Sequence, residues 1–144
     1  MSQILTTALT YYGTKEVYGD KSNDQILKWI NAQMPWVIDD SKSAWCGSFM
    51  AGVLEEAGYK DQIPDTPQVA INWMKVGRPI SAKDRKIGDL AIFYRFSPED
   101  WRSHVCIYIN DDHEGYFRCL GGNQSNQVNI AQRSAFKLRG FRRV

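Results

Sequence analysis

The chain has 144 residues, of which 43% are hydrophobic and 24% charged, a composition typical of a globular protein with one core. Its formal net charge of +2 is too small to indicate a nucleic-acid partner or attraction to an anionic membrane. No apolar run approaches the length of a transmembrane helix, so we expect no stable membrane insertion. These bounds predict a single domain over residues 1–144. We expect a monomer, although length and composition do not determine the oligomeric state.

The first half of the chain carries helical patterns. Apolar residues recur at helical spacing over residues 2–12 and again over residues 24–34, where residues 22–24 offer an N-terminal cap. A turn-rich connector, residues 13–20, separates these two helices. A shorter helix is expected over residues 67–74, after a loop that contains two prolines.

A third helix, residues 46–57, is predicted to begin at Cys46. Five apolar residues follow at helical spacing, namely Phe49, Met50, Val53, Leu54 and Ala57. Gly58 is a suitable stop, and Ser41 or Ser43 can cap the start. A cysteine in the first turn of a helix lies at the positive end of the helix dipole, which favours the nucleophilic thiolate over the thiol. The alternative is that Cys46 is simply a small buried apolar residue.

The second half of the chain changes to strand patterns. Residues that favour strands dominate five segments, which are residues 87–94, 104–109, 116–120, 127–131 and 136–142. Helices that come first and strands that follow one another predict an α+β fold with a small antiparallel sheet. Three cysteines without a CxxC pair argue against a disulfide framework.

His104 opens the second predicted strand, directly after a polar loop. Because side chains alternate along a strand, His104 shares one face with Cys106 and Tyr108, and Val105 lies on the other face with Ile107. A histidine at a strand edge can reach the N-terminus of a helix packed on the sheet, which is the geometry that a thiol–imidazole pair needs. The alternative is an ordinary surface histidine.

Asn123 follows two glycines at the end of the third predicted strand. Antiparallel pairing would bring this end close to His104, where a polar side chain can accept the second imidazole N–H and fix the tautomer. Gln124 is a neighbour with a similar capability. The alternative is turn chemistry, because Gly-Gly-Asn is a common turn composition.

Other polar residues allow several interpretations. The acidic pair Asp39 and Asp40 could cap a helix, bind a metal, contact a substrate or lie in a solvated loop. His113 lies among acidic residues in a hairpin connection and is expected to be solvated. A zinc site without a closely spaced ligand pair is conceivable; its ligands would be Cys106, Cys119, His104 and His113. The basic C-terminal end indicates a solvated surface or a weak attraction to an anionic polymer.

Four motifs occur in an order that resembles the CHAP and NlpC/P60 superfamily of papain-like cysteine peptidases and amidases. They are WCGSF at residues 45–49, GDLAIF at 88–93, SHVCIY at 103–108 and LGGNQS at 120–125. The resemblance covers most of the chain, from about residue 13 to the C-terminus. It implies a papain-like fold in which the nucleophile helix packs on the antiparallel sheet.

The resemblance also implies site residues. The catalytic residues would be Cys46 as nucleophile, His104 as general base and Asn123 as the residue that orients the imidazole. The backbone N–H of Cys46 would contribute to the oxyanion hole, and no metal or cofactor would be needed. Some relatives bind calcium through an acidic loop, whose spaced pattern residues 39–40 do not reproduce. Substrate contacts are assigned to Trp45, Gln124 and Asp40.

The implied activity is hydrolysis of an amide bond in bacterial peptidoglycan, by a stem-peptide endopeptidase or an N-acetylmuramoyl-L-alanine amidase. Two alternatives are a non-catalytic cell-wall-binding module and a Cys-His deamidase or transglutaminase-like toxin that acts on proteins. The first residues lack a signal-peptide pattern, so we expect synthesis in the host cytoplasm and action on the cell wall after release, as in a phage endolysin. A phage tail enzyme or an interbacterial toxin would leave the same sequence features.

Overall fold

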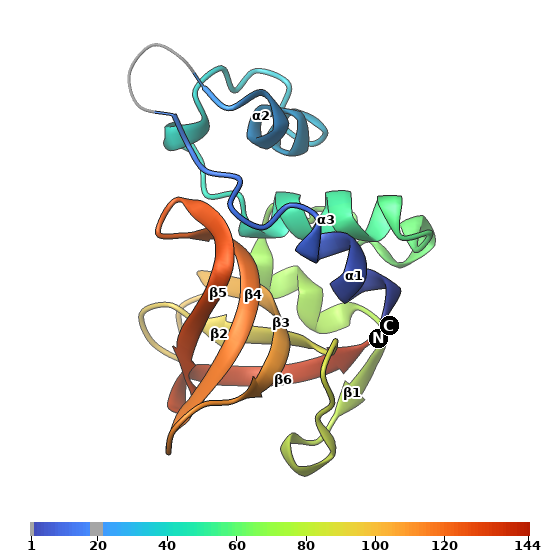
Figure 1. The fold of residues 1–144 in the computed structure, drawn as a ribbon, viewed down its shortest axis with the longest axis vertical. Helices are drawn as coiled ribbons and strands as arrows, with labels where there is room; N and C mark the ends of the chain where they lie inside the picture. The colour runs from blue at the N-terminus through green and yellow to red at the C-terminus, as the bar shows by residue number, and fades with distance from the viewer. Residues whose placement is uncertain (1, 18–21) are drawn as a thin grey trace.

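The computed structural model describes residues 2–17 and 22–144, and the end of the predicted connector, residues 18–20, lies outside them. In the described chain three α-helices come first and six strands follow, which confirms the predicted α+β arrangement. Helix α3 (Cys46–Glu56) lies between the sheet and α2 (Asp24–Asn31), as Figure 1 shows. None of the described helices is both long and apolar enough to cross a membrane.

The first two helices begin at the polar residues that cap them. In α1 (Gln3–Leu9) the backbone N–H of Leu5 donates to the Ser2 hydroxyl at 3.0 Å. In α2 the Asn23 side chain accepts from two N–H groups of the first turn, at 2.9 and 3.2 Å. Both helices are shorter than predicted, because the hydrophobic periodicity continues past the last helical hydrogen bond.

Helix α3 has the predicted start and stop but not the predicted cap. The N-cap position is occupied by Trp45, which makes no side-chain capping bond, so the caps predicted at Ser41 and Ser43 are wrong. Gly58 follows the C-cap Ala57; its N–H donates to the carbonyl of Glu55 at 3.2 Å, and the N–H of Tyr59 donates to the carbonyl of Leu54 at 2.8 Å. This pair of bonds is the Schellman arrangement that satisfies the last free carbonyl groups of a helix.

Six strands form one antiparallel sheet in the order β1-β6-β2-β3-β4-β5. Their bounds are β1 Arg78–Ile80, β2 Leu90–Tyr94, β3 Ser103–Asp111, β4 Tyr116–Gln124, β5 Gln127–Ser134 and β6 Leu138–Arg143. Five of them correspond to the predicted strands, and β1 is an additional edge strand. Short 3₁₀ helices fill the connections: η1 Asp40–Lys42, η2 Lys60–Gln62, η3 Ala70–Lys75, η4 Ala82–Asp84 and η5 Ala135–Lys137. The helix predicted over residues 67–74 is therefore the 3₁₀ segment η3.

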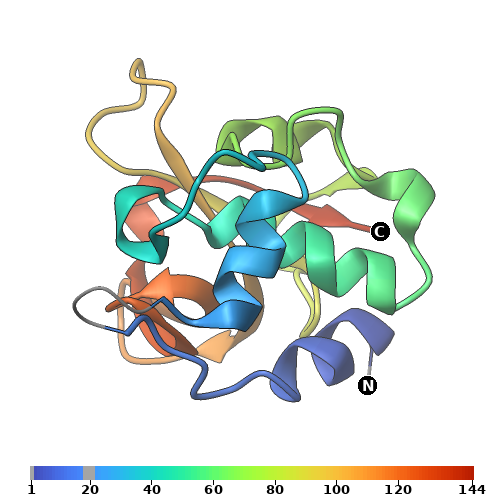
Figure 2. The ribbon, with the colours of Figure 1, turned by 90° about the horizontal axis from the view of Figure 1, so that it is seen from above.

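The alternation of side chains along the strands divides the core in two. Leu90, Ile92, Val105 and Ile107 pack against the helices, whereas the residues between them belong to a second apolar cluster on the other face of the sheet. Figure 2 shows α1, α2 and α3 on the same side of the sheet, where they cover the larger cluster. The predicted alternation of faces in β3 is thus confirmed.

Candidate active site

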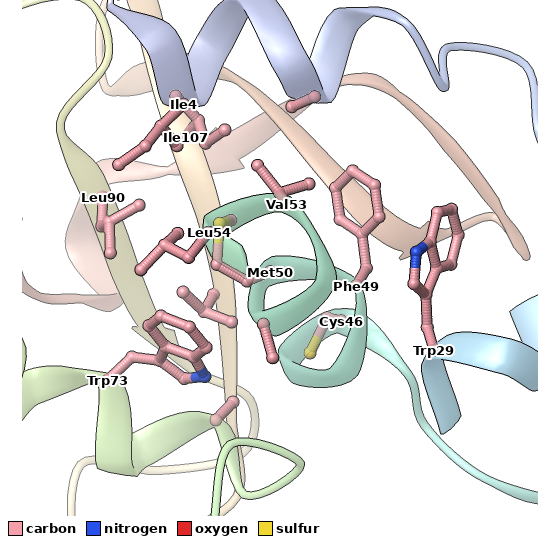
Figure 3. Close-up of a cluster of buried hydrophobic side chains, with 14 of the residues drawn as sticks. Ile4, Trp29, Cys46, Phe49, Met50, Val53, Leu54, Trp73, Leu90 and Ile107 are labelled. Atoms are coloured by element: carbon pink, nitrogen blue, oxygen red, sulfur yellow. The ribbon is translucent and has the colours of Figure 1, made fainter. Parts of the chain in front are cut away.

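Cys46 is the first residue of α3 and is almost completely buried, with 5% of its surface exposed. Figure 3 shows it at the start of the helix, with Phe49 and Trp29 on one side and Trp73 on the other. The chain passes very close to this first helical turn, since a Cβ atom at Gly47 would lie only 2.0 Å from the carbonyl oxygen of Pro67. Glycine at this position therefore allows the loop to pack against the turn that carries the thiol.

Burial raises the pKa of the Cys46 thiol above its ordinary value. Four smaller effects act in the opposite direction: hydrogen bonding from the backbone N–H groups of Val105 and Gly47, and the positive charges of Arg95 and Arg133. The expectation from the helix terminus left out desolvation, which is the largest effect on the pKa of this thiol. The contribution of Val105 also places the sulfur beside β3, next to the residue that follows His104.

His104 lies near the start of β3 and is 7% exposed. Its Nε2 atom is 2.9 Å from the Oε1 atom of Gln124. Because an amide oxygen can only accept a hydrogen bond, Nε2 carries the proton. In the neutral imidazole the lone pair is then on Nδ1, which is the atom left to act as a base.

The orientation of the Gln124 amide is determined by its other partners. Its Nε2 atom donates to the backbone carbonyl of Asn129 at 2.8 Å and to that of Cys119 at 3.2 Å. Its Oε1 atom accepts from Nε and Nη2 of Arg133, both at 3.1 Å. A carbonyl cannot donate and a guanidinium cannot accept, so only one amide orientation satisfies this network.

The imidazole partner is therefore Gln124 rather than the predicted Asn123. Asn123 is half-buried and has a left-handed backbone, with φ of 58°. The Gly-Gly-Asn segment is part of β4 and not a turn, and the turn itself consists of Ser125 and Asn126, between the paired residues Gln124 and Gln127. The substrate contact predicted for Gln124 is corrected as well, because this side chain is 2% exposed and serves His104.

Close packing explains both glycines before Asn123, and a Cβ atom at Gly121 would lie 2.9 Å from the Cβ of Cys106. A Cβ atom at Gly122 would lie 2.8 Å from the Cβ of Phe49 and 2.8 Å from the ring of Trp45. The glycine therefore allows β4 to approach the first turns of α3, which brings the strand that carries Gln124 close to the helix that carries Cys46.

Two further predicted substrate contacts are buried structural residues. Trp45 is fully buried, stacks on Trp29 with ring centroids 6.1 Å apart, and donates from its indole N–H to Glu16 at 2.8 Å. Asp40 is also fully buried and accepts from the backbone N–H of Asn23 at 2.7 Å, at the start of α2. The solvated loop considered for Asp40 is therefore wrong, and the structure offers neither side chain to a ligand at the surface.

His113 and Cys119 do not contact His104, whereas Cys106 does: burial raises the pKa of the Cys106 thiol, and its side-chain interaction with His104 lowers it. His113 has a side chain 61% exposed, as expected, and lies 3.4 Å from a carboxylate oxygen of Asp112. Cys106 and Cys119 are fully buried free thiols in the second apolar cluster. Within residues 2–17 and 22–144, no three His, Cys, Asp or Glu side chains are grouped so that they could hold a metal ion.

Three basic residues around His104 were not assigned to the site from the sequence, although two of them, Arg133 and Lys137, belong to its basic C-terminal end. Arg95, Arg133 and Lys137 line a cavity of about 280 Å³ in which His104 forms part of the wall. Arg95 directly follows β2, Arg133 is in β5 and Lys137 is in η5, so no local motif contains them. The pairing of β4 with β5 through a two-residue turn is the one sequence signal that could have placed Arg133 near Gln124.

No protein-family profile and no curated protein matches the sequence. Solved structures are similar in fold. A lipoprotein of the NLP/P60 family from Staphylococcus aureus has 22% identity and a TM-score of 0.52, over 98% of this chain and 40% of its own. The peptidoglycan hydrolase RipB from Mycobacterium tuberculosis has 16% identity and a TM-score of 0.56, over 96% of this chain and 61% of its own.

A third similar structure, RipD from Mycobacterium tuberculosis, is described as a non-catalytic NlpC/p60 domain protein adapted to peptidoglycan binding. It has 15% identity and a TM-score of 0.54, over 98% of this chain and 94% of its own. This chain spans less than two thirds of the length of the first two proteins. The arrangement of helices and sheet, together with these similarities, shows that the chain has the NlpC/P60 fold, which both hydrolases and non-catalytic proteins use.

Proposed function

We propose that this protein is a cysteine hydrolase that cuts an amide bond in bacterial peptidoglycan. Cys46 is the nucleophile, His104 is the general base, and Gln124 orients the imidazole. The observation that supports this most strongly is the buried contact between Nε2 of His104 and Oε1 of Gln124, which assigns the lone pair of a neutral imidazole to Nδ1. A histidine with only a packing role would not need a partner such as Gln124, whose amide is itself held by Arg133 and by the carbonyl groups of Asn129 and Cys119.

The reaction is an acyl transfer in two halves. His104 takes the thiol proton of Cys46, and the sulfur attacks the amide carbonyl to form a tetrahedral oxyanion. The C–N bond then breaks, and the imidazolium gives its proton to the leaving amine. A water molecule, deprotonated by His104, then attacks the thioester. The C–S bond breaks, which releases the acid product and restores the Cys46 thiolate, and the imidazolium returns its proton to the sulfur. Since burial raises the pKa of Cys46, the thiol has to be deprotonated by His104 during the reaction.

The start of α3 supplies the oxyanion donors. The first-turn N–H groups of a helix have no intrahelical acceptors, and Trp45 does not cap them with its side chain. The backbone N–H of Cys46 is the donor that we assign to the oxyanion. One such donor is typically worth about 3 kcal/mol of transition-state stabilisation.

The assignment of peptidoglycan as substrate rests on the fold and on the described properties of similar structures. RipB is described as a peptidoglycan hydrolase and RipD as a peptidoglycan-binding protein. A cut within the stem peptide or between sugar and stem fits the same chemistry. Delivery as a phage endolysin, as a tail enzyme or as an interbacterial toxin stays a prediction from the sequence.

Mass spectrometry of fragments released from purified peptidoglycan tests the proposal. Wild type and the Cys119→Ala variant are expected to release the same products, whereas Cys46→Ala releases none. Cys119 is a suitable control because it is an equally buried free thiol on the other face of the sheet. The masses of the fragments identify the bond that is cut.

The similarity to RipD supports one rival, a non-catalytic module that binds the cell wall. In that case no fragment is released from walls of several chemistries, yet wild type and Cys46→Ala sediment equally well with insoluble peptidoglycan. This result would replace hydrolysis with binding. Fragment release that survives the loss of Cys46 would reject the assigned nucleophile.

A further inference from the structure

The connection between β2 and β3 leads directly into His104, and one side chain from β6 holds it. Arg139 donates from Nε to the Ser103 hydroxyl and from Nη1 to the backbone carbonyl of Pro98, both at 3.0 Å. Its Nη2 atom donates to the backbone carbonyl of Asp100. The guanidinium therefore binds three points of the chain before His104, and the last of them is the residue next to it.

Arg139 occupies an irregular position in the sheet. In the pairing of β6 with β2, Gly140 lies opposite Ile92 and Leu138 lies opposite Phe93. Two consecutive residues of β2 therefore face alternate residues of β6, and Arg139 between them has no opposite residue in β2. Such an extra residue forms a β-bulge, which bends the strand and gives a side chain a new direction. The bulge explains how a side chain of β6 reaches past its neighbour β2 to the connection beyond it.

The acceptors of Arg139 are neutral. Among the described residues, no carboxylate forms an ion pair with it. The carboxylate of Asp100 instead accepts from Nε and Nη2 of Arg102, at 3.0 and 2.7 Å. The contribution of Arg139 therefore comes from the number and direction of its hydrogen bonds. A planar guanidinium with five N–H donors suits three acceptors in fixed directions, whereas a lysine is a point charge without that geometry.

Ser103 connects this arginine to the histidine. Its hydroxyl accepts from Arg139 and donates to the backbone carbonyl of Trp101 at 2.9 Å, and the residue is 7% exposed. The next residue, His104, is equally buried. Gln124 holds the ring of His104 at Nε2, but the position of the backbone that carries this ring depends on where the chain enters β3.

We propose that Arg139 is a positioning residue for His104, because it fixes the point at which the chain enters β3. The inference rests on the proposed function, in which the imidazole must come within hydrogen-bond reach of the Cys46 thiol. A catalytic group displaced by about 1 Å through a remote substitution can lose about 100-fold in rate. Arg139 binds the chain before the histidine and not the imidazole itself, so its loss should lower kcat and leave KM nearly unchanged.

Steady-state kinetics on soluble peptidoglycan fragments test the inference. Arg139→Met removes the three hydrogen bonds and should lower kcat about tenfold or more, with KM within about twofold of wild type. Arg139→Lys can bind one of the acceptors and should recover part of kcat. If Arg139→Met does not fold, Arg139→Lys decides: a lower kcat with the KM of wild type supports the inference, and the kcat of wild type overturns it.

Arg142→Met is the matched control. Arg142 lies in the same strand, is also half-buried, and donates to the backbone carbonyls of Val76 and Gly77 at 2.7 and 3.0 Å. Its loss should lower the free energy of unfolding to a similar extent but leave kcat at the value of wild type. An unchanged kcat in Arg139→Met, or equal losses of kcat in both variants, overturns the inference and leaves the proposed hydrolase in place.

Failure of the proposed function is recognised when wild type cuts no wall fragment, and then a measurement without substrate decides. The NMR chemical shifts of the imidazole nitrogens of His104 report which nitrogen carries the proton. They should indicate the single Nε2–H tautomer in wild type and in Arg142→Met, because the contact with Gln124 is intact there. A shift toward the average of the two tautomers in Arg139→Met supports the positioning of His104 even without hydrolysis. A single Nε2–H tautomer in Arg139→Met overturns it.

Discussion

In the proposed hydrolase, Gln124 takes the place of the carboxylate that orients the imidazole in other triads, but it carries no negative charge. Its amide oxygen receives the imidazole N–H and two guanidinium N–H groups, and its amide nitrogen is held by backbone carbonyls. A neutral acceptor does not stabilise an imidazolium as a carboxylate would. We therefore infer that its main contribution is to fix the tautomer and the ring orientation.

The first prediction separates Gln124 from its neighbour. Gln124→Ala should lower kcat/KM about 100-fold or more, since orienting residues of triads have effects of this size or larger. Asn123→Gly removes the neighbouring side chain and suits the left-handed backbone, so it should stay within about threefold of wild type. Both are measured on the same fragment-release assay, with thermal unfolding as a check of folding.

The Gln124→Glu variant distinguishes two causes of activity loss in Gln124→Ala: loss of the imidazole orientation and loss of side-chain packing. It keeps an oxygen for His104 and Arg133 but loses the amide N–H groups that bind Asn129 and Cys119. It should recover part of the activity that Gln124→Ala loses. A severe loss in Asn123→Gly together with a mild loss in Gln124→Ala would return the orienting role to Asn123.

The second prediction concerns the ionisation of Cys46. Since burial raises the pKa of this thiol, its alkylation by iodoacetamide should accelerate at higher pH than that of an unfolded control peptide. Arg133→Gln and Arg95→Gln should move the midpoint further up, because each removes a positive charge that lowers the pKa. Mass spectrometry of the labelled peptide measures the rate, and Cys46→Ala identifies labelling of other thiols.

The same shift has a consequence for stability. The folded thiol keeps its proton at pH values where the unfolded thiol has already lost it, so the unfolded state binds fewer protons there. Stability is therefore complete below the ordinary thiol pKa and decreases as the pH rises through the raised value. If the pH midpoint of Cys46 alkylation were at or below that of the unfolded peptide, the pKa of this thiol would not be raised, and the helix terminus would outweigh burial.

At the scale of elements, the sequence predicted what depends on local periodicity. Helix α3 and five strands follow from repeated apolar spacing, and the start and stop of α3 follow from Cys46 and Gly58. The edge strand β1 has three residues, one of them proline, so no pattern marks it. The segment η3 has apolar residues at helical spacing, but it forms a 3₁₀ helix. Its form depends on packing against β2, β3 and β6, which the local sequence does not show.

The candidate site was predicted in part for the same reason. Cys46 and His104 stand at element starts that the pattern identifies, and the alternation in β3 fixes the face of His104. The choice between Asn123 and Gln124 depends on the register of β4 against β5. A shift of one residue in this register would exchange the side chain that faces the imidazole, and the sequence alone does not determine the register.

The third prediction tests the close approach of β4 to α3. In Gly122→Ala the new methyl group would meet Phe49 and Trp45 at 2.8 Å, inside a fully buried part of the core. Such overpacking typically costs about 1–3 kcal/mol, and we expect a value at the upper end because two rings and a helix must shift. Urea unfolding measures the change in the free energy of unfolding.

Gly140→Ala in β6 is the control for this substitution. There the added Cβ would lie 3.0 Å from the terminal methyl group of Met74, which can move away by rotating its flexible side chain. We expect a loss below about 1 kcal/mol, in the range of substitutions that a site accommodates. Equal effects of the two substitutions would argue against a tight contact between β4 and α3.

On the scale of the whole molecule, one buried ion pair joins distant parts of the chain. Asp89 lies in the turn before β2 and has a side chain only 3% exposed, and it binds Arg143 of β6 through two hydrogen bonds of 2.7 and 2.8 Å. Its carboxylate also accepts from the backbone N–H of Lys86 at 2.8 Å, which fixes the turn itself. The pair therefore ties the entrance of β2 to the end of the neighbouring strand.

The fourth prediction follows from the burial of this carboxylate. Arg143→Met leaves the buried carboxylate of Asp89 without its cation, and a buried carboxylate without a cation is strongly destabilising. Arg102→Met breaks a pair whose arginine side chain is 51% exposed, and such surface pairs contribute about 0–1 kcal/mol. Chemical denaturation should therefore show a much larger loss in the free energy of unfolding for Arg143→Met than for Arg102→Met.

The double variant Asp89→Asn with Arg143→Met is the control. It should recover part of the lost free energy of unfolding, because no charge is then buried without a partner. If Arg143→Met and Arg102→Met lost equally little stability, the Asp89 carboxylate would have to be solvated in solution, and the connection between β2 and β6 would rest on their backbone hydrogen bonds alone.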